Sequence, residues 1–300
     1  MDHRHLRHAK SLLPQMHQDA SPIHEGENSY VWGLAGGLVL KIRENNHQGT
    51  SETRTQEYLE FNSLTVPVPK IRQELIDQFT GMHHLYMDRI PGERLSCVWD
   101  LMSEPMRESI ADQMVAYVGQ LSSLTSDYIG GLDGGPIWDN LLFPGQTEPR
   151  GPFANNDELF AALASQIDGE YHDAMPALYK LMPSASPPTF THGDLHMGSV
   201  IVCGDRIVGI TGWENAGFFP VWSESAKMQS SPVVDEEWRE MLLARGIPEH
   251  ADAIFFVDVF SVLRGGGQRA AEMCEALVKE SYDDIQQVFD MIDDDEEELD

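Results

Sequence analysis

Hydrophobic and polar positions follow a strand-like pattern in the first third of the chain. Residues 25–34 and 38–42 predict two strands joined by a glycine-containing turn, and Lys41 stands near the end of the second, apolar run. Residues 51–61 have the pattern of a helix. Residues 65–71 carry prolines at alternate positions, which hold the backbone extended, and residues 84–92 predict a strand that ends in a Pro-Gly turn.

A helical period dominates the rest of the chain. Ser103 is suited to cap a helix with Pro105 in its first turn, and apolar residues then recur at helical spacing up to Leu121. Two short β-type runs, at residues 200–202 and 206–210, interrupt this part. Further helices are expected over residues 157–166, 222–228, 236–245, 251–263 and 268–291.

The pattern and the length together predict an α+β protein with two lobes. Three hundred residues exceed the usual size of a single domain. We expect an N-terminal extension over residues 1–22, a small β-rich N-lobe over residues 23–88 and a larger helical C-lobe over residues 89–290. Residues 291–300 are almost all acidic and repel one another, so we expect a disordered tail there.

Charge narrows the choice of partner. The formal net charge is −29 at pH 7. Nucleic acids and anionic membrane surfaces are bound through basic patches, so this charge argues against both. A small molecule is the expected partner, and a cationic one would be attracted. The pattern leaves the oligomeric state open.

The cysteines and the hydropathy favour a soluble cytoplasmic protein. Cys97, Cys203 and Cys274 are far apart and lack the C-x-x-C spacing of metal or redox sites, which favours reduced thiols. No apolar run is long enough to span a membrane, and no apolar stretch of the kind found in a leader peptide follows the basic residues at the start.

The most specific pattern is His192-Gly193-Asp194-Leu195-His196-Met197-Gly198-Ser199. It has the form of a phosphotransfer loop, in which the Asp accepts the proton of the attacking hydroxyl and an Asn at the last position holds Mg²⁺. Here the Asp is Asp194, and the last position is Ser199. Downstream, in Thr211-Gly212-Trp213-Glu214, Gly212 stands where an Asp would bind the metal. Two metal-ligand positions therefore lack their usual side chains.

These motifs resemble those of a known family. Residues 190–196, F-T-H-G-D-L-H, and residues 210–214, I-T-G-W-E, are similar to F-x-H-G-D-L-x-x-x-N and I-I-D-W-E of the aminoglycoside phosphotransferase and choline kinase-like family. The resemblance extends from about Ile23 to about Met228 and is strongest for the fungal branch. It implies a two-lobed, protein-kinase-like α+β fold whose cleft takes ATP, Mg²⁺ and a small molecule.

The resemblance also assigns roles in the N-lobe. It implies that Lys41 contacts the nucleotide phosphates and that Glu57, on the predicted helix, is its ion-pair partner. It places Gly26 in the loop that covers the nucleotide and Met87 in the strand leading to the hinge beside the adenine. From the residues alone, a surface lysine and one of several helix acids are the simpler interpretation of Lys41 and Glu57.

Three functional hypotheses remain open at this stage. The first is a family member that binds a small-molecule metabolite, or a protein partner, with ATP- and Mg²⁺-dependent transfer impaired or lost. The second is a metal-independent acid/base enzyme, such as an isomerase or cyclase, that uses Asp194, His196 and Glu214. The third is a still-active O-phosphotransferase in which Glu214 or Asp194 replaces the metal ligands. His196 also fits a structural hydrogen bond within its loop.

Overall fold

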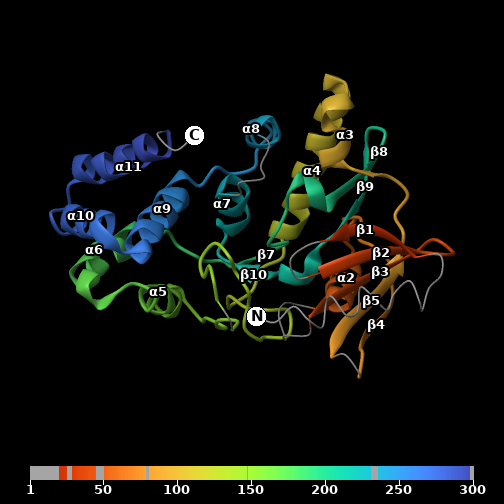
Figure 1. Cartoon of the computed structure of the whole chain (residues 1–300), viewed down its shortest axis with the longest axis horizontal. Coiled ribbons are helices and arrows are strands. Elements are labelled where there is room, and N and C mark those ends of the chain that lie inside the picture. Colours follow the sequence, from red (N-terminus) through yellow and green to blue (C-terminus); the bar gives the residue numbers. More distant parts are fainter. Residues whose placement is uncertain are drawn as a thin grey trace. The chain divides into compact units, whose positions relative to one another are not determined.

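The computed structural model describes residues 20–25, 29–44, 51–78, 81–146, 148–230 and 236–297. The chain forms two compact units, and each combines separate stretches of sequence. Unit 1 contains the described residues of 1–121, 194–216 and 233–246, and unit 2 contains those of 122–193, 217–232 and 247–300. The secondary structure is α+β, with a large sheet in unit 1 and mainly helices in unit 2 (Figure 1).

Unit 1 begins with an antiparallel sheet of five strands in the order β1-β2-β3-β5-β4 (Figure 1). The strands are β1 (Ser21–Glu25), β2 (Ser29–Leu34), β3 (Leu38–Glu44), β4 (Ile71–Ile76) and β5 (Met82–Asp88). β2 and β3 form the predicted hairpin, in which Leu34 pairs with Leu38 across the glycine turn. β4 lies at the edge beside β5.

Side-chain alternation along β3 explains how an apolar strand carries a buried lysine. Leu40 and Ile42 point to one face of the sheet and belong to an apolar cluster there. Val39 points to the other face and packs in a cluster with Met87. Because successive side chains of a strand alternate between faces, Lys41 shares the face of Val39.

Helix α2 (Glu52–Phe61) presents one buried face. Its buried side chains are Glu52, Thr55 and Leu59, and their spacing of three and four residues places them in one row. Ser51 caps the helix, because its hydroxyl accepts a hydrogen bond from the Arg54 amide at 3.3 Å.

Glu74 of β4 anchors the start of α2. Its carboxylate accepts hydrogen bonds from the Ser51 hydroxyl at 2.7 Å and from the Thr53 amide at 3.3 Å. Its other oxygen lies 2.8 Å from Nε2 of His83, and Nε of Arg43 donates to the second ring nitrogen of His83 at 3.3 Å. A carboxylate at a helix N-terminus is favoured by the unpaired amides and the helix dipole. The network therefore ties α2 to β3, β4 and β5.

The rest of unit 1 surrounds a small antiparallel sheet in the order β6-β8-β9. Its elements are β6 (Glu93–Arg94), α3 (Leu95–Val98), α4 (Glu104–Ser122), β8 (Val200–Cys203), β9 (Arg206–Ile210) and α8 (Glu236–Ala244), with short 3₁₀ turns at Trp99–Leu101, Met197–Ser199 and Trp213–Asn215. Gln113 of α4 binds the β8–β9 connection, donating to the Asp205 carbonyl at 2.7 Å and accepting from the Ile207 amide at 3.0 Å. α4 thereby holds the strands that follow the His192–Ser199 motif.

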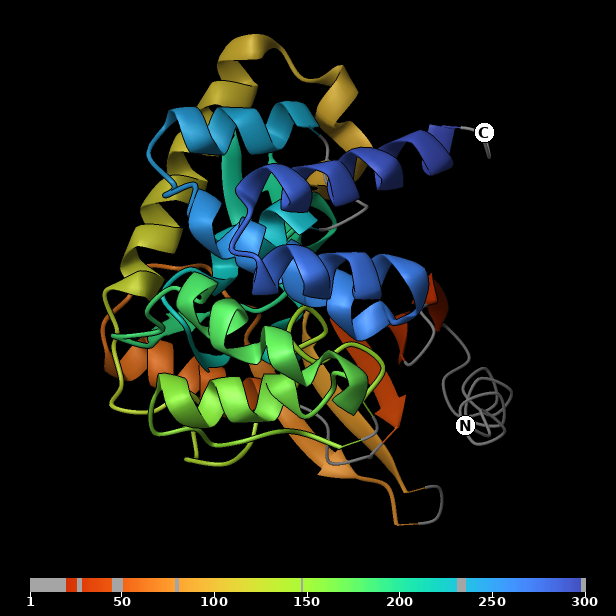
Figure 2. The same cartoon turned by 90° about the vertical axis from the view of Figure 1, so that its left-hand side faces the viewer.

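Unit 2 is built on one large cluster of buried apolar side chains. Its elements are α5 (Asn156–Ala164), α6 (Met175–Leu181), α7 (Ser223–Ser230), α9 (Ala251–Gly265), α10 (Gly267–Val278), α11 (Tyr282–Glu297), a 3₁₀ segment at Gly169–Ala174, and the paired strands β7 (Thr189–Thr191) and β10 (Gly217–Phe219). α9 and α11 both lie against α10 (Figure 2). Among the described helices, none combines the length and the apolar character that a membrane span requires.

Most of the predicted strands and helices lie close to their expected ranges, but the helix expected over residues 268–291 is two helices, α10 and α11, and the division of the chain differs. The boundary expected near Asp88 is not a boundary between the units, because β6, α3 and α4 belong with the large sheet. The acidic tail was expected to be disordered from residue 291, whereas α11 continues to Glu297. Extending an existing helix needs no new nucleus, which accounts for this difference. Residues 1–19 and 298–300 lie outside the described part, and the three cysteines are free thiols.

We predict that Glu74→Gln destabilises the protein in a pH-dependent way. Burial opposes ionisation of Glu74, but the hydrogen bonds from His83, Thr53 and Ser51 outweigh it and lower its pKa to about 2. Because the folded pKa lies below the unfolded one, the stabilisation is complete above about pH 4.5 and is lost as the pH falls toward about 2. It amounts to about 3 kcal/mol at most.

Urea unfolding of the wild type and Glu74→Gln between about pH 6 and about pH 3 measures this contribution. The difference in unfolding free energy should shrink toward the acid end. Glu57→Gln, on the exposed face of the same helix, should stay within about 0.5 kcal/mol of the wild type throughout. A constant difference for Glu74→Gln across the range would contradict the prediction.

Candidate functional site

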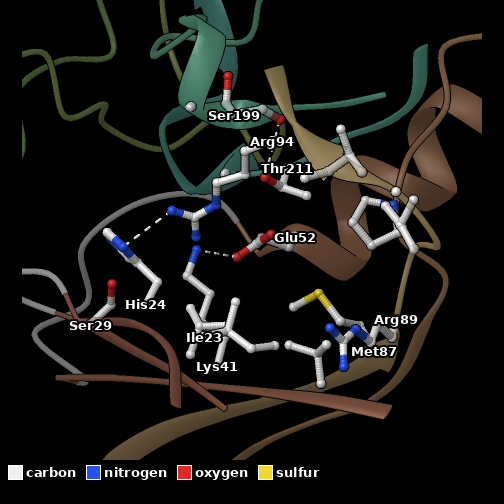
Figure 3. A pocket seen from close by; sticks show the side chains of 18 of the residues that line it. Ile23, His24, Ser29, Lys41, Glu52, Met87, Arg89, Arg94, Ser199 and Thr211 are labelled. Carbon is white, nitrogen blue, oxygen red and sulfur yellow. Dashed lines mark hydrogen bonds and ion pairs between the residues drawn. The ribbon is translucent and has the colours of Figure 1, made fainter. Parts of the chain in front are cut away.

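Unit 1 contains a cavity of about 480 Å³ that gathers most of the predicted site residues. Those that line it are Lys41, Met87, Asp194, His196, Ser199, Gly212 and Glu214. Apolar side chains, including Val31, Val39, Ile90 and Ile201, line it as well. Figure 3 shows its interior. Glu57 does not line the cavity, and Gly26 lies outside the described residues.

Lys41 is held between two carboxylates. Its Nζ lies 2.8 Å from Oε1 of Glu52 and 2.7 Å from Oε2 of Glu214. The side chains of Lys41 and Glu52 are buried, whereas that of Glu214 is 29% exposed. Lys41 comes from β3, Glu52 from the first turn of α2 and Glu214 from the 3₁₀ turn at Trp213–Asn215. Separate parts of unit 1 therefore meet at one ammonium group.

The charges of this cluster do not balance, since one ammonium faces two carboxylates. Burial pulls the pKa of Lys41 down, but the charges of Glu52 and Glu214 outweigh it and raise that pKa above its ordinary value. Burial also opposes ionisation of Glu214, yet Lys41 lowers the pKa of Glu214 to about 2. Burial raises the pKa of Glu52, and the neighbouring Glu214 charge adds to the effect. Lys41 is therefore charged at neutral pH, and its charge is neutralised within the protein.

The predicted pairing of Lys41 with Glu57 is wrong. Glu57 is exposed, whereas Glu52 is buried and accepts a hydrogen bond from Lys41. A helix turns once in about 3.6 residues, so a position five residues farther along faces another direction. The register of Glu52 with Leu59 on the buried face of α2 is the signal in the sequence that would have identified it.

The side chains of His196 and Ser199 fix the conformation of the loop that carries Asp194. The Ser199 hydroxyl donates to the His196 carbonyl at 2.7 Å and accepts from the His196 amide at 3.2 Å. Nδ1 of His196 accepts a hydrogen bond from the Gly198 amide at 3.0 Å. The Ser199 carbonyl in turn accepts from the Thr211 amide at 2.8 Å. Both side chains therefore bind the local backbone, which is the structural role considered for His196.

The bond to Nδ1 determines where the proton of the neutral imidazole lies. A ring nitrogen that accepts a hydrogen bond carries no proton, so the proton of neutral His196 is on Nε2. Nε2 lies 4.0 Å from Oδ2 of Asp194, whose side chain is 62% exposed. His196 thus directs an N–H group, and no basic lone pair, toward Asp194.

The first two residues of the motif belong to unit 2, where α7 holds their backbone. The Glu224 carboxylate accepts a hydrogen bond from the His192 amide at 2.7 Å. Nζ of Lys227 donates to the Gly193 carbonyl at 3.3 Å and lies 3.1 Å from the buried carboxylate of Asp139. Side chains from one helix therefore fix the backbone at the start of the motif.

The residues present do not fit the Mg²⁺ site that the motif implies. Mg²⁺ prefers carboxylate, carbonyl and water oxygens in near-octahedral geometry. Gly212 supplies no side chain, the Ser199 hydroxyl binds a backbone carbonyl, and Glu214 binds Lys41. Over the ranges that the structure describes, no group of three or more His, Cys, Asp or Glu side chains could hold a metal ion.

Two residues of the cavity were missed at the level of sequence. His24 of β1 and Arg94 of β6 both line it, and Nη1 of Arg94 lies 3.3 Å from Nδ1 of His24 (Figure 3). The pair joins positions 70 residues apart. The position of Arg94 just after the Pro91-Gly92 turn was the available signal, and nothing in the pattern connects it with His24.

Comparison with known protein families now identifies the chain. The profile described as the phosphotransferase enzyme family, or APH, matches residues 19–256, which is most of the chain. The chain belongs to this family. A search of curated proteins found no match for it.

Solved structures of aminoglycoside phosphotransferases share the fold. The GDP complex of aminoglycoside 2'-phosphotransferase-IIIa has a TM-score of 0.57 and 13% identity, over 99% of this chain and 100% of that chain. The streptomycin-ATP-APH(2")-IIa complex has a TM-score of 0.55 and 14% identity, over 93% and 96%. The apo form of a thermostable APH(4)-Ia variant has a TM-score of 0.55 and 16% identity, over 93% and 94%. This likeness establishes a kinase-like α+β fold.

We predict that Lys41→Met destabilises the protein more than Glu52→Gln or Glu214→Gln does. Removing the lysine leaves two facing carboxylates without a counter-charge, and breaking a buried ion pair in this way costs about 3–5 kcal/mol. Either glutamine variant leaves Lys41 with one carboxylate. Urea unfolding at neutral pH measures all three losses.

Lys180→Met is the matched control, because Lys180 pairs with Glu280 on the surface, where their side chains are 68% and 66% exposed. Its effect should be within about 1 kcal/mol. Equal losses for Lys41→Met and Lys180→Met would show that the buried cluster does not contribute as described.

Proposed function

We propose that the protein binds a small-molecule metabolite in the cavity of unit 1, with ATP- and Mg²⁺-dependent phosphoryl transfer impaired or lost. One observation carries the proposal. At the positions where the family motif provides metal ligands, Gly212 has no side chain and the Ser199 hydroxyl binds the His196 carbonyl. Glu214, a carboxylate two positions after Gly212 in the chain, is engaged by Lys41 at 2.7 Å.

The energetic consequence for phosphoryl transfer is large. This reaction depends on positioning and on neutralising the charge of the phosphate oxygens, which is mainly the work of Mg²⁺. Weakening the metal site should raise the barrier by several kcal/mol, and about 1.4 kcal/mol corresponds to a tenfold loss of rate. Phosphates would also have to compete with Glu52 and Glu214 for Lys41.

The cavity itself supports a binding function. Its volume of about 480 Å³ is within the range of small-molecule sites, which combine apolar side chains with a few oriented polar groups. Solved relatives are described in complexes with GDP, with ATP and with aminoglycosides. A nucleotide is therefore one candidate ligand for this chain, with Met87 and Val39 on its apolar side.

The metal-independent acid/base hypothesis receives less support. A general base needs a free lone pair, but Nδ1 of His196 accepts the Gly198 amide hydrogen and Nε2 bears the proton. Within this loop, Asp194 is the residue that brings an exposed carboxylate to the cavity. His196 therefore acts in this proposal as a structural residue.

We predict that the wild type shows no ATP turnover dependent on Mg²⁺ or Mn²⁺, and that Ser199→Asn combined with Gly212→Asp raises the metal-dependent rate. The two substitutions return the ligands that the family motif provides, so a gain of about 100-fold or more over the wild-type background is expected. Phosphate release with and without EDTA is the measurement. Adding Asp194→Asn to the double variant should remove the gain. Metal-dependent turnover by the wild type that Asp194→Asn abolishes would overturn the proposal.

We also predict that nucleotide binding does not require a divalent cation. A ligand that binds only the folded state raises the melting temperature by mass action. Any stabilisation by ATP should therefore be the same with EDTA as with Mg²⁺, because neither Gly212 nor Ser199 offers the ion a free side chain. A melting-temperature increase seen only with Mg²⁺ would contradict this.

A further inference from the structure

Arg94 is a cation of the cavity that no described carboxylate neutralises. Among the described residues, its guanidinium has one hydrogen-bond partner, Nδ1 of His24 at 3.3 Å. Arginine has only donors, so His24 must accept this bond and is neutral in the pair. Burial, followed by the charges of Arg94 and Lys41, holds the pKa of His24 below its ordinary value, which agrees with that state.

The other charges of the cavity are compensated or exposed. Glu52 and Glu214 bind Lys41, and the Asp88 carboxylate receives two hydrogen bonds from Arg72, at 2.6 and 2.7 Å. Asp194 lies in the loop beside His196, and Glu93 and Arg89 are exposed. Arg94 is half-buried, so its charge is less screened by water than a surface charge.

The orientation of Arg94 brings its donors into the cavity. In Figure 3 the side chains of Arg94 and Lys41 enter from opposite sides, and their cationic ends point toward one another. His24 contacts Arg94 through its Nδ1 atom, and the charge of Lys41 also contributes to lowering the pKa of His24. Glu52 and Glu214 neutralise the charge of Lys41, whereas no described carboxylate neutralises that of Arg94.

We infer that Arg94, oriented by His24, is the anion-binding residue of this cavity, and that the ligand carries a phosphate or carboxylate group there. A planar guanidinium matches both groups, because it donates parallel hydrogen bonds to two oxygens. The inference deepens the proposed function and rests on it. It assigns to Arg94 the ligand contact that the family resemblance assigns to Lys41, and it replaces the expectation of a cationic ligand.

The experiment measures binding by calorimetry in EDTA, with tripolyphosphate, citrate and ATP as anionic probes and adenosine as the uncharged one. At least one of tripolyphosphate and citrate should bind the wild type, and Arg94→Gln should weaken that binding about 10- to 100-fold, as expected for a charge-assisted contact. The affinity of Arg94→Lys should lie between those of the wild type and Arg94→Gln. Lysine keeps the charge but lacks the planar guanidinium that donates two parallel hydrogen bonds. Binding of tripolyphosphate alone assigns the site to phosphates, and binding of citrate alone assigns it to carboxylates.

Arg206→Gln is the matched control, because Arg206 is exposed on β9, does not line the cavity and changes the net charge equally. It should leave every affinity unchanged. The inference would be overturned if Arg94→Gln bound the anions as tightly as the wild type, or if Arg206→Gln weakened binding equally. It would also be overturned if the wild type bound neither tripolyphosphate nor citrate. None of these binding results depends on turnover. Mg²⁺-dependent activity of the wild type would refute the proposed loss of catalysis, but the role of Arg94 would still be decided by the binding measurements.

Discussion

The ion pairs of Lys41 with Glu52 and Glu214 are the interaction on which the rest of the site depends. A buried ammonium is unfavourable without a partner, and here a strand, a helix and a 3₁₀ turn each contribute one member of the cluster. The same cluster links the large sheet of unit 1 to the segment just after Gly212. A ligand anion that approached Lys41 would have to compete with these two carboxylates.

The fold was largely predictable from sequence, because the hairpin, the proline-rich connection and the apolar helices each have a local signature. The family motif located Asp194, Ser199 and Gly212, and all of them line the cavity. The choice of Glu52 over Glu57 required the register of α2 against the sheet, and no short segment contains that information. The contact of Arg94 with His24 was harder still to predict from sequence, since it joins strands of two different sheets.

The hydrogen bonds within the motif show how the loop can keep its conformation without a bound ion. Ser199 binds the His196 backbone with both the donor and the acceptor capacity of its hydroxyl, and His196 binds the Gly198 amide. These bonds connect neighbouring residues and need no ion. The loop is therefore shaped by its own side chains, and Asp194 is presented to the cavity whether or not it takes part in chemistry.

The conformation of Gly212 sets a cost on any side chain at this position. With φ at 89° and ψ at 40°, this residue occupies a region that glycine enters freely and that side chains enter at a cost of about 1 kcal/mol or more. An acid placed here would have to hold the same backbone under strain, and only a bound ion would offset that cost. Folding stability and metal binding therefore make opposite demands on this one residue.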